Sequence, residues 1–287
     1  GIPTAVFPAR DYVLRPIEGT AREYEYRRLS VLGDIVGGRL QAVCVPDEGL
    51  TQYTTPRAEF CNNTRTLHPG DTVPRTELTA LLYNAGYARR AQVDGPGQFS
   101  IRGDIVDLYA PDMKLPVRME FWGDEIDTMH TFDLATQRRE DPIEKIYVSP
   151  AREVLFGSPA EAAELLRAFI KKFRGKKRTA LEACLATELA QLDGGALPVN
   201  MDKYLAVRYP QPATLLDYFD DPLLVLEEPA SLREAERATT YRRGEEISAL
   251  LQDGVLAAGL DNLYAENGYL WAQAANHRTI CAENFAR

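Results

Sequence analysis

Residues 93–133 constrain the fold of this chain more than any other segment, because hydrophobic and polar side chains alternate along them. One set of alternate positions is hydrophobic: Val117, Met119 and Phe121. The other set carries Arg118, Glu120 and Trp122. A β-strand points successive side chains to opposite faces, so this segment is predicted to be a strand with one buried and one polar face. Trp122 falls on the polar face.

The segment before it follows the same period of two. Phe99 and Ile101 alternate with Ser100 and Arg102, so Arg102 is predicted to share the polar face with Arg118 in a small antiparallel sheet. Gly123 and Asp124 come next after Trp122, and a glycine in the first position of a two-residue turn favours a type II′ hairpin.

Two interpretations of the polar face stay open. In the first, a neighbouring helix covers Trp122 and the arginines are ordinary surface charges. In the second, the face binds another protein, because an exposed tryptophan flanked by arginines has the composition of interaction hot spots. The second interpretation is favoured.

A long ordered series of short motifs makes the chain resemble a known family. The series comprises residues 96–107 (PGQFSIRGDIVD), 116–127 (PVRMEFWGDEID), 132–133 (FD), 136–138 (TQR) and 150–153 (PARE). It is similar to the N-terminal region of the bacterial transcription-repair coupling factors (Mfd), in the module that they share with the excision-repair protein UvrB. The motifs at 136–138 and 150–153, with Phe7 and Pro8, favour the coupling factors over UvrB.

The resemblance implies a partner and a site. UvrA is the implied partner, and the contact positions of the family fall on Arg102, Arg118 and Trp122. Trp122 departs from the more usual phenylalanine, which keeps an aromatic anchor but changes its size. A full-length coupling factor would be an ATP-dependent DNA translocase that contacts RNA polymerase and double-stranded DNA through domains not expected here. ATP and Mg²⁺ would belong to those motor domains, and this fragment is expected to need no cofactor.

The order of predicted elements indicates an α/β fold. A helix over 21–36, a buried strand over 40–45, a central strand over 223–226 and a helix from Ser231 are typical of an α/β layer. Residues 51–71 are expected to be extended. A helix over 76–86 opens the inserted α+β module, and helices over 160–173 and 179–192 follow it.

The resemblance implies a degenerate RecA-like (P-loop NTPase-like) domain interrupted by that antiparallel-sheet module. The expected domains are residues 1–72, the first and N-terminally truncated part of the RecA-like domain; 73–156, the UvrB-like, UvrA-binding module; and 157–287, helices and the second part of the RecA-like domain.

The sequence gives little support for a catalytic function. Glu227 and Glu228 end an apolar run where nucleotide hydrolases place carboxylates, but the G-x-x-x-x-G-K-[ST] phosphate loop occurs nowhere in the chain. We therefore expect no catalytic residue. The alternative is a nucleotide- or DNA-binding fragment of a helicase-like, UvrB-like repair ATPase.

Charge and composition fit a protein-binding role better than a nucleic-acid role. The net charge is −9, and one basic cluster, residues 171–178, is interpreted as a solvated helix end, with phosphate contact as the alternative. The four cysteines and three histidines lack metal-ligand spacing, so no metal is expected. No apolar run approaches the length of a spanning helix, which predicts a cytoplasmic protein without a membrane partner.

Overall fold

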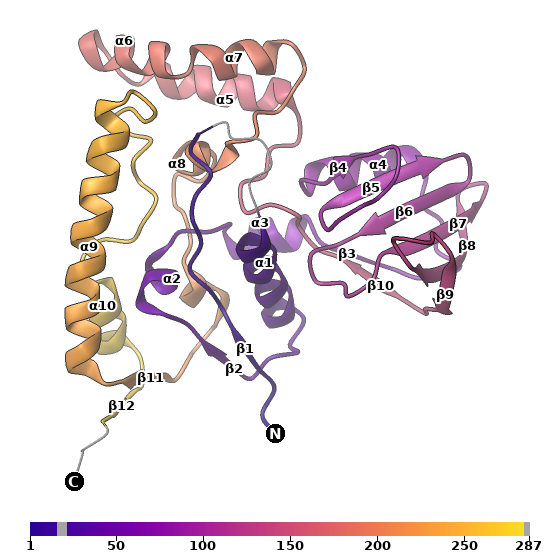
Figure 1. Ribbon diagram of the computed structural model, residues 1–287, viewed down its shortest axis with the longest axis horizontal. Coiled ribbons are helices and arrows are strands. Elements are labelled where there is room, and N and C mark those ends of the chain that lie inside the picture. The colour runs from indigo at the N-terminus through magenta and orange to yellow at the C-terminus, as the bar shows by residue number, and fades with distance from the viewer. Residues whose placement is uncertain (16–21, 284–287) are drawn as a thin grey trace.

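The computed structural model describes residues 1–15 and 22–283. In Figure 1 the module with the main sheet lies on the right, and helices α5 (Pro159–Lys171), α6 (Gly175–Cys184) and α7 (Ala186–Asp193) lie across the top. A central α/β part is bordered on the left by the long helix α9 (Pro229–Gln252). The fold is mixed α/β with several sheets, which confirms the predicted class.

The central part begins with a short parallel pair, β1 (Thr4–Val6) and β2 (Ala42–Cys44), connected through helix α1 (Glu23–Val36). The short helices α2 (Asp47–Thr51) and α3 (Arg57–Asn62) follow. Leu29 and Leu32 of α1 are fully buried. They pack in one cluster with the fully buried Phe7 and Phe60.

The module between residues 65 and 148 has two sheets and one helix. Its main sheet has the order β4-β5-β6-β7-β8-β9, and a second sheet pairs β3 with β10. The strands are β3 (Arg65–Leu67), β4 (Ala88–Arg89), β5 (Gln98–Arg102), β6 (Ile105–Tyr109), β7 (Val117–Trp122), β8 (Glu125–Phe132), β9 (Arg139–Pro142) and β10 (Ile146–Val148). Helix α4 (Arg75–Asn84) buries Leu78 and Leu82 against the inner face of the main sheet.

The alternation predicted for the central strand of this module is confirmed. Val117 is 2%, Met119 0% and Phe121 5% exposed. They belong to the same cluster as Phe99 and Val106 from the neighbouring strands.

The helical region packs around a separate hydrophobic cluster that includes Leu166, Leu181 and Leu205. Its helices are α5 (Pro159–Lys171), α6 (Gly175–Cys184), α7 (Ala186–Asp193) and α8 (Leu205–Arg208), with 3₁₀ helices η1 (Met201–Tyr204) and η2 (Leu215–Tyr218). The chain ends with β11 (Leu224–Glu227), α9 (Pro229–Gln252), α10 (Tyr269–Asn276) and β12 (Thr279–Ala282), and β11 pairs in parallel with β12.

The burial predicted for two strands was wrong. The run at 223–226 was expected to be a central strand, but β11 has only β12 as its partner among the described strands, and Val225 is 61% exposed. In β2, Ala42 and Cys44 are exposed, so this strand is not buried as predicted. A continuous apolar run does not reveal how many strands will flank it, because those strands lie elsewhere in the sequence.

Three further predictions were wrong in detail. The single helix expected over 179–192 is two helices, α6 and α7, which meet at Leu185, a fully buried residue that serves as a cap for both. The stretch 51–71, expected to be extended, contains α3. Lys176, Lys177 and Arg178 begin α6 and do not end α5, so only part of the basic cluster lies at a helix C-terminus.

Candidate protein-interaction surface

The strand register decides which side chains share the outer face of the main sheet. Arg118 of β7 lies opposite Asp107 of β6, and Asp107 lies opposite Ser100 of β5. Directly paired residues in an antiparallel sheet point to the same side, so this row is continuous from β5 to β7. Arg102, two residues beyond Ser100, joins the same face. The face defined by Arg102, Asp107, Arg118 and Trp122 is called the outer face below.

Asp107 connects Arg102 and Arg118, the two arginines predicted as site residues. Its Oδ2 accepts a hydrogen bond from Arg102 Nη2 at 2.5 Å and another from Arg118 Nη2 at 2.9 Å, and its Oδ1 accepts from Arg118 Nε at 2.7 Å. The Asp107 side chain is 0% exposed, whereas that of Arg102 is 45% and that of Arg118 12% exposed. One buried carboxylate therefore orients two guanidinium groups, and only Arg102 keeps a large part of its surface free.

Arg118 is also held by the loop between β8 and β9. Its Nη1 donates to the carbonyl of Gln137 at 3.2 Å, its Nη2 donates to the side-chain Oε1 of Gln137 at 3.3 Å, and its guanidinium lies over the Phe132 ring. Gln137 adopts a positive φ of 59°, which few side chains other than glycine adopt readily. The hydrogen bond to Asp107 is the main cause that raises the pKa of Arg118 above its usual value. Arg118 thus carries a fixed positive charge in a preorganised site.

Trp122 stands at the end of β7 with 82% of its surface exposed. It pairs with Glu125 across the hairpin, and Gly123 has a φ of +63°, the left-handed conformation that glycine adopts at low cost. No described element covers the ring as the first interpretation expected. A large exposed aromatic side chain at a rigid hairpin is the composition of an interaction anchor.

Two of the acidic residues close to this surface form ion pairs. Glu120 forms an ion pair with Arg139 of β9, and Asp104 in the hairpin between β5 and β6 pairs with Arg75 at 2.5 Å. The outer face is therefore mixed in charge, with its arginines gathered around Asp107.

Two residues of this surface were missed as site residues. Asp107 belonged to the quoted motif but received no role, although a carboxylate between Val106 and Leu108 in a strand was a usable signal. Gln137 lies 19 residues from Arg118, and nothing in the local sequence connects the two.

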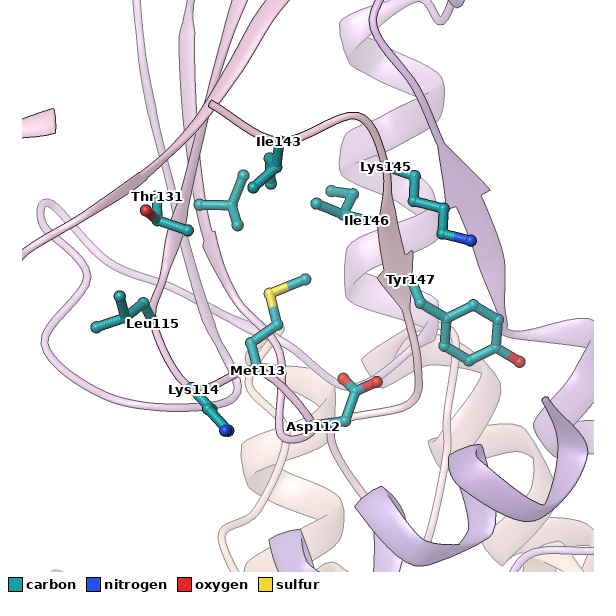
Figure 2. A pocket seen from close by; sticks show the side chains of 10 residues that line it. Asp112, Met113, Lys114, Leu115, Thr131, Ile143, Lys145, Ile146 and Tyr147 are labelled. Carbon is teal, nitrogen blue, oxygen red and sulfur yellow. The ribbon is translucent and has the colours of Figure 1, made fainter. Parts of the chain in front are cut away.

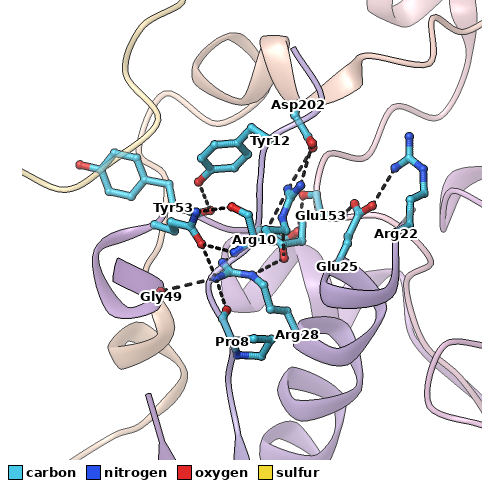
Figure 3. A network of polar contacts seen from close by, with 12 residues as sticks. Pro8, Arg10, Tyr12, Arg22, Glu25, Arg28, Gly49, Tyr53, Glu153 and Asp202 are labelled. Atoms are coloured by element: carbon cyan, nitrogen blue, oxygen red, sulfur yellow. Dashed lines mark hydrogen bonds and ion pairs between the residues drawn. The ribbon is translucent and has the colours of Figure 1, made fainter. Parts of the chain in front are cut away.

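The module is anchored to the central part by a buried network of ion pairs (Figure 3). Glu153, which is 0% exposed, accepts from Arg28 Nε of α1 at 2.6 Å and forms an ion pair with Arg10 at 3.3 Å. Arg10 continues to Asp202 at 2.7 Å. The network joins Arg10, which follows β1, and Arg28 of α1 to Glu153 after the module and to Asp202 after α7, so it connects the central part, the module and the helical region.

An open hollow of 270 Å³ lies on the other side of the main sheet (Figure 2). Val117 and Thr131 line this hollow. These two residues are paired across β7 and β8, and they point to the face of the sheet away from Arg118. Met113 and Ile146 reach into its centre, and Lys114 and Lys145 stand at its rim. This hollow is separate from the outer face.

Within residues 1–15 and 22–283, no group of three or more histidine, cysteine or acidic side chains could hold a metal ion. Helices of the described chain are all too short or too polar to cross a membrane.

Comparison with known proteins bears directly on the module. Residues 66–154 match the family model of the UvrB interaction domain. The chain is 28% identical over 257 residues to the transcription-repair-coupling factor of Bacillus subtilis (strain 168), which covers 87% of this chain and 22% of that protein. It is also 28% identical over 259 residues to the same factor from Staphylococcus haemolyticus (strain JCSC1435), with 86% and 22% covered.

The resemblance to transcription-repair coupling factors is confirmed. The matched regions extend well beyond the module and include most of the flanking α/β and helical parts. The chain spans about a fifth of the length of these curated relatives. The outer face lies wholly within the residues that match the UvrB interaction domain.

Proposed function

We propose that this chain is the part of a transcription-repair coupling factor that recruits UvrA during nucleotide excision repair, and that UvrA binds the outer face. The exposed Trp122 beside two arginines held by Asp107 is the observation that carries this proposal. The match of residues 66–154 to the UvrB interaction domain supports it, because that domain is named for an interaction and not for catalysis.

The three site residues would contribute in different ways. Trp122 supplies the apolar anchor, since most of its ring can be desolvated by a partner. Arg102 supplies a guanidinium that can pair with a carboxylate of UvrA, because nearly half of its side chain is exposed. Arg118 acts mainly by holding Asp107 and, through it, Arg102, because only 12% of its own side chain reaches solvent.

The rest of the chain would be a non-catalytic scaffold. We propose that residues 1–72 and 157–287 form a degenerate RecA-like domain around the module at 73–156, with no bound cofactor. In the cytoplasmic full-length protein, ATP-driven translocation and contacts with RNA polymerase and double-stranded DNA would then belong to other domains. The lack of a phosphate-binding loop in the sequence supports this division.

A nucleotide- or DNA-binding fragment of a repair ATPase is the second candidate. The basic cluster at 171–178 favours it, because its lysines and arginines are exposed at the junction of α5 and α6. Against it, the net charge is −9, and phosphate contacts need a concentration of positive charge.

The test is titration calorimetry of this chain with purified UvrA, accompanied by an ATP turnover assay on the chain alone. Saturable binding that Trp122→Ala weakens without a change in melting temperature supports recruitment. ATP turnover that survives repurification and disappears in Glu228→Gln would establish the second candidate instead.

A further inference from the structure

A second site lies between the module and the helical region, away from the outer face. It is a cavity of 560 Å³ whose walls come from the turn between α4 and β4, from residues 152–159 and from the loop before η1. Its size lies within the range of about 300–1,000 Å³ that is usual for ligand pockets. Three of the large hydrophobic side chains that remain exposed in this protein gather there: Tyr83, Leu197 and Val199.

Arg152 gives this apolar cavity one positive charge. Its side chain is half-buried and lines the cavity, and among the described residues its guanidinium forms no hydrogen bond or ion pair. Burial is the main cause that lowers the pKa of Arg152, and the nearby Arg22 lowers it further. A half-buried guanidinium without a described hydrogen-bond partner attracts an arriving carboxylate, because the attraction between the two charges is stronger where water is partly excluded.

Three carboxylates of this region already have hydrogen-bond partners of their own. Glu25 pairs with Arg22 at 2.7 Å, Asp202 pairs with Arg10 at 2.7 Å, and Glu161 accepts a hydrogen bond from the Gly157 N–H at 2.8 Å. The positive end of the helix dipole of α5 also faces this region, because Ser158 caps that helix at the cavity. The cavity therefore combines apolar walls with a guanidinium that has no hydrogen-bonded carboxylate among the described residues.

The sheet edge beside the cavity favours a peptide over a small molecule. β4 is the terminal strand of the main sheet, and Tyr87 and Ala88 at its start line the cavity. Figure 1 shows β4 on the side of the module that faces the helical region. The N–H groups of Ala88 and Arg90 donate to the carbonyls of Gly97 and Phe99, so the backbone groups of Arg89 between them point to the opposite edge, where a peptide strand could be added.

We propose that this cavity binds an extended peptide segment of a partner protein, with apolar side chains against Leu197 and Val199 and an acidic side chain paired with Arg152. The site shares no residue with the outer face, so a partner could bind here while UvrA occupies the outer face.

The probe is a library of acetylated tetrapeptide amides. Positions 1, 2 and 4 carry apolar residues, and position 3 carries aspartate or glutamate. A matched library carries asparagine or glutamine instead. We expect the acidic library to be enriched on this chain and the best peptide to shift the methyl NMR signals of Leu197, Val199 and Met201. Arg152→Gln should raise the dissociation constant at least tenfold, and Leu197→Ser should also weaken binding.

Two controls separate this site from the rest of the protein. Arg237→Gln removes an exposed arginine from α9, and Trp122→Ala alters the outer face; both should leave peptide affinity unchanged. Equal recovery of acidic and amide libraries, or unchanged affinity in a folded Arg152→Gln variant, overturns the proposal. Binding of 4-phenylbutyrate as tight as that of the best peptide overturns the assignment to a peptide.

Discussion

The buried carboxylate of Asp107 accepts two hydrogen bonds from Arg118, at 2.7 Å to Nε and 2.9 Å to Nη2. A planar guanidinium that bonds to both carboxylate oxygens has a fixed orientation and stays protonated. Because the same carboxylate also accepts from Arg102, the two arginines behave as one unit. The outer face is thus rigid before any partner arrives.

Asp107→Asn should destabilise the protein. The substitution leaves two guanidinium groups facing a neutral amide at a fully buried position, and such a loss typically costs about 1–3 kcal/mol. Urea unfolding measures it. Asp104→Asn is the matched control, because Asp104 pairs with Arg75 on the exposed surface of the same sheet, where loss of the pair costs less than about 1 kcal/mol. Equal stability of Asp107→Asn and the parent would contradict this account.

Trp122→Ala should weaken UvrA binding and leave stability unchanged. Truncation of a hot-spot aromatic costs about 2 kcal/mol or more, which is roughly thirtyfold in affinity. The side chain is 82% exposed, so the core should not respond. Calorimetry with UvrA and thermal melts check both parts. Tyr241→Ala removes another exposed aromatic side chain, on α9, and should bind UvrA normally. If the two variants bind UvrA equally well, Trp122 is not the anchor.

The sequence predicted Trp122 better than it predicted Arg118. Exposure of Trp122 follows from the period of two within one strand, which is local information. The environment of Arg118 depends on the pairing of β6 with β7 and on a loop 19 residues away, and neither is local. Arg118→Glu would place a second carboxylate beside the buried Asp107, so loss of UvrA binding by this variant must be judged together with its melting temperature.

The flanking regions were less predictable for a similar reason. Helix periodicity located α1, α4 and α5 to within a few residues, and it located the start of α9. It did not predict the break at Leu185, whose side chain is buried between helices that are distant in the sequence. The network around Glu153 was not predicted either, because its members come from positions 10, 28, 153 and 202.

Glu153→Gln should be among the most destabilising single changes in this chain. It removes the charge that faces both Arg10 and Arg28 in a site without solvent, and breaking a buried pair in this way costs about 3–5 kcal/mol. Urea unfolding at neutral pH measures the loss. Asp193→Asn breaks the exposed pair with Arg167 and serves as the control, with an expected cost below about 1 kcal/mol. A cost for Glu153→Gln no larger than that of the control would show that the network does not stabilise the fold.

Stability should fall in acid through Asp202 and Glu188. Burial raises the pKa of Asp202, but Arg10 and the Val13 N–H outweigh burial and hold it below the usual value. Burial also raises the pKa of Glu188, but the pKa is lowered overall because Lys203 Nζ donates a hydrogen bond to Glu188 Oε1 at 2.7 Å and its positive charge lies nearby. A folded pKa below the unfolded one means that the native state binds fewer protons than the unfolded state. The stabilisation is therefore complete above the unfolded values of about 4 and is lost as pH falls through the folded ones.

Urea unfolding of the parent, of Asp202→Asn and of Glu188→Gln at pH 7, 5, 4 and 3 tests this. Asp112 has a pKa raised by burial and works in the opposite direction, so the informative quantity is the difference between variant and parent at each pH. We expect each variant to be less stable than the parent at pH 7 and the difference to shrink below about pH 4, where these carboxylates bind protons in the unfolded parent while the folded parent still holds them ionised. A difference that stays constant from pH 7 to pH 3 would mean that these ion pairs do not control the acid response.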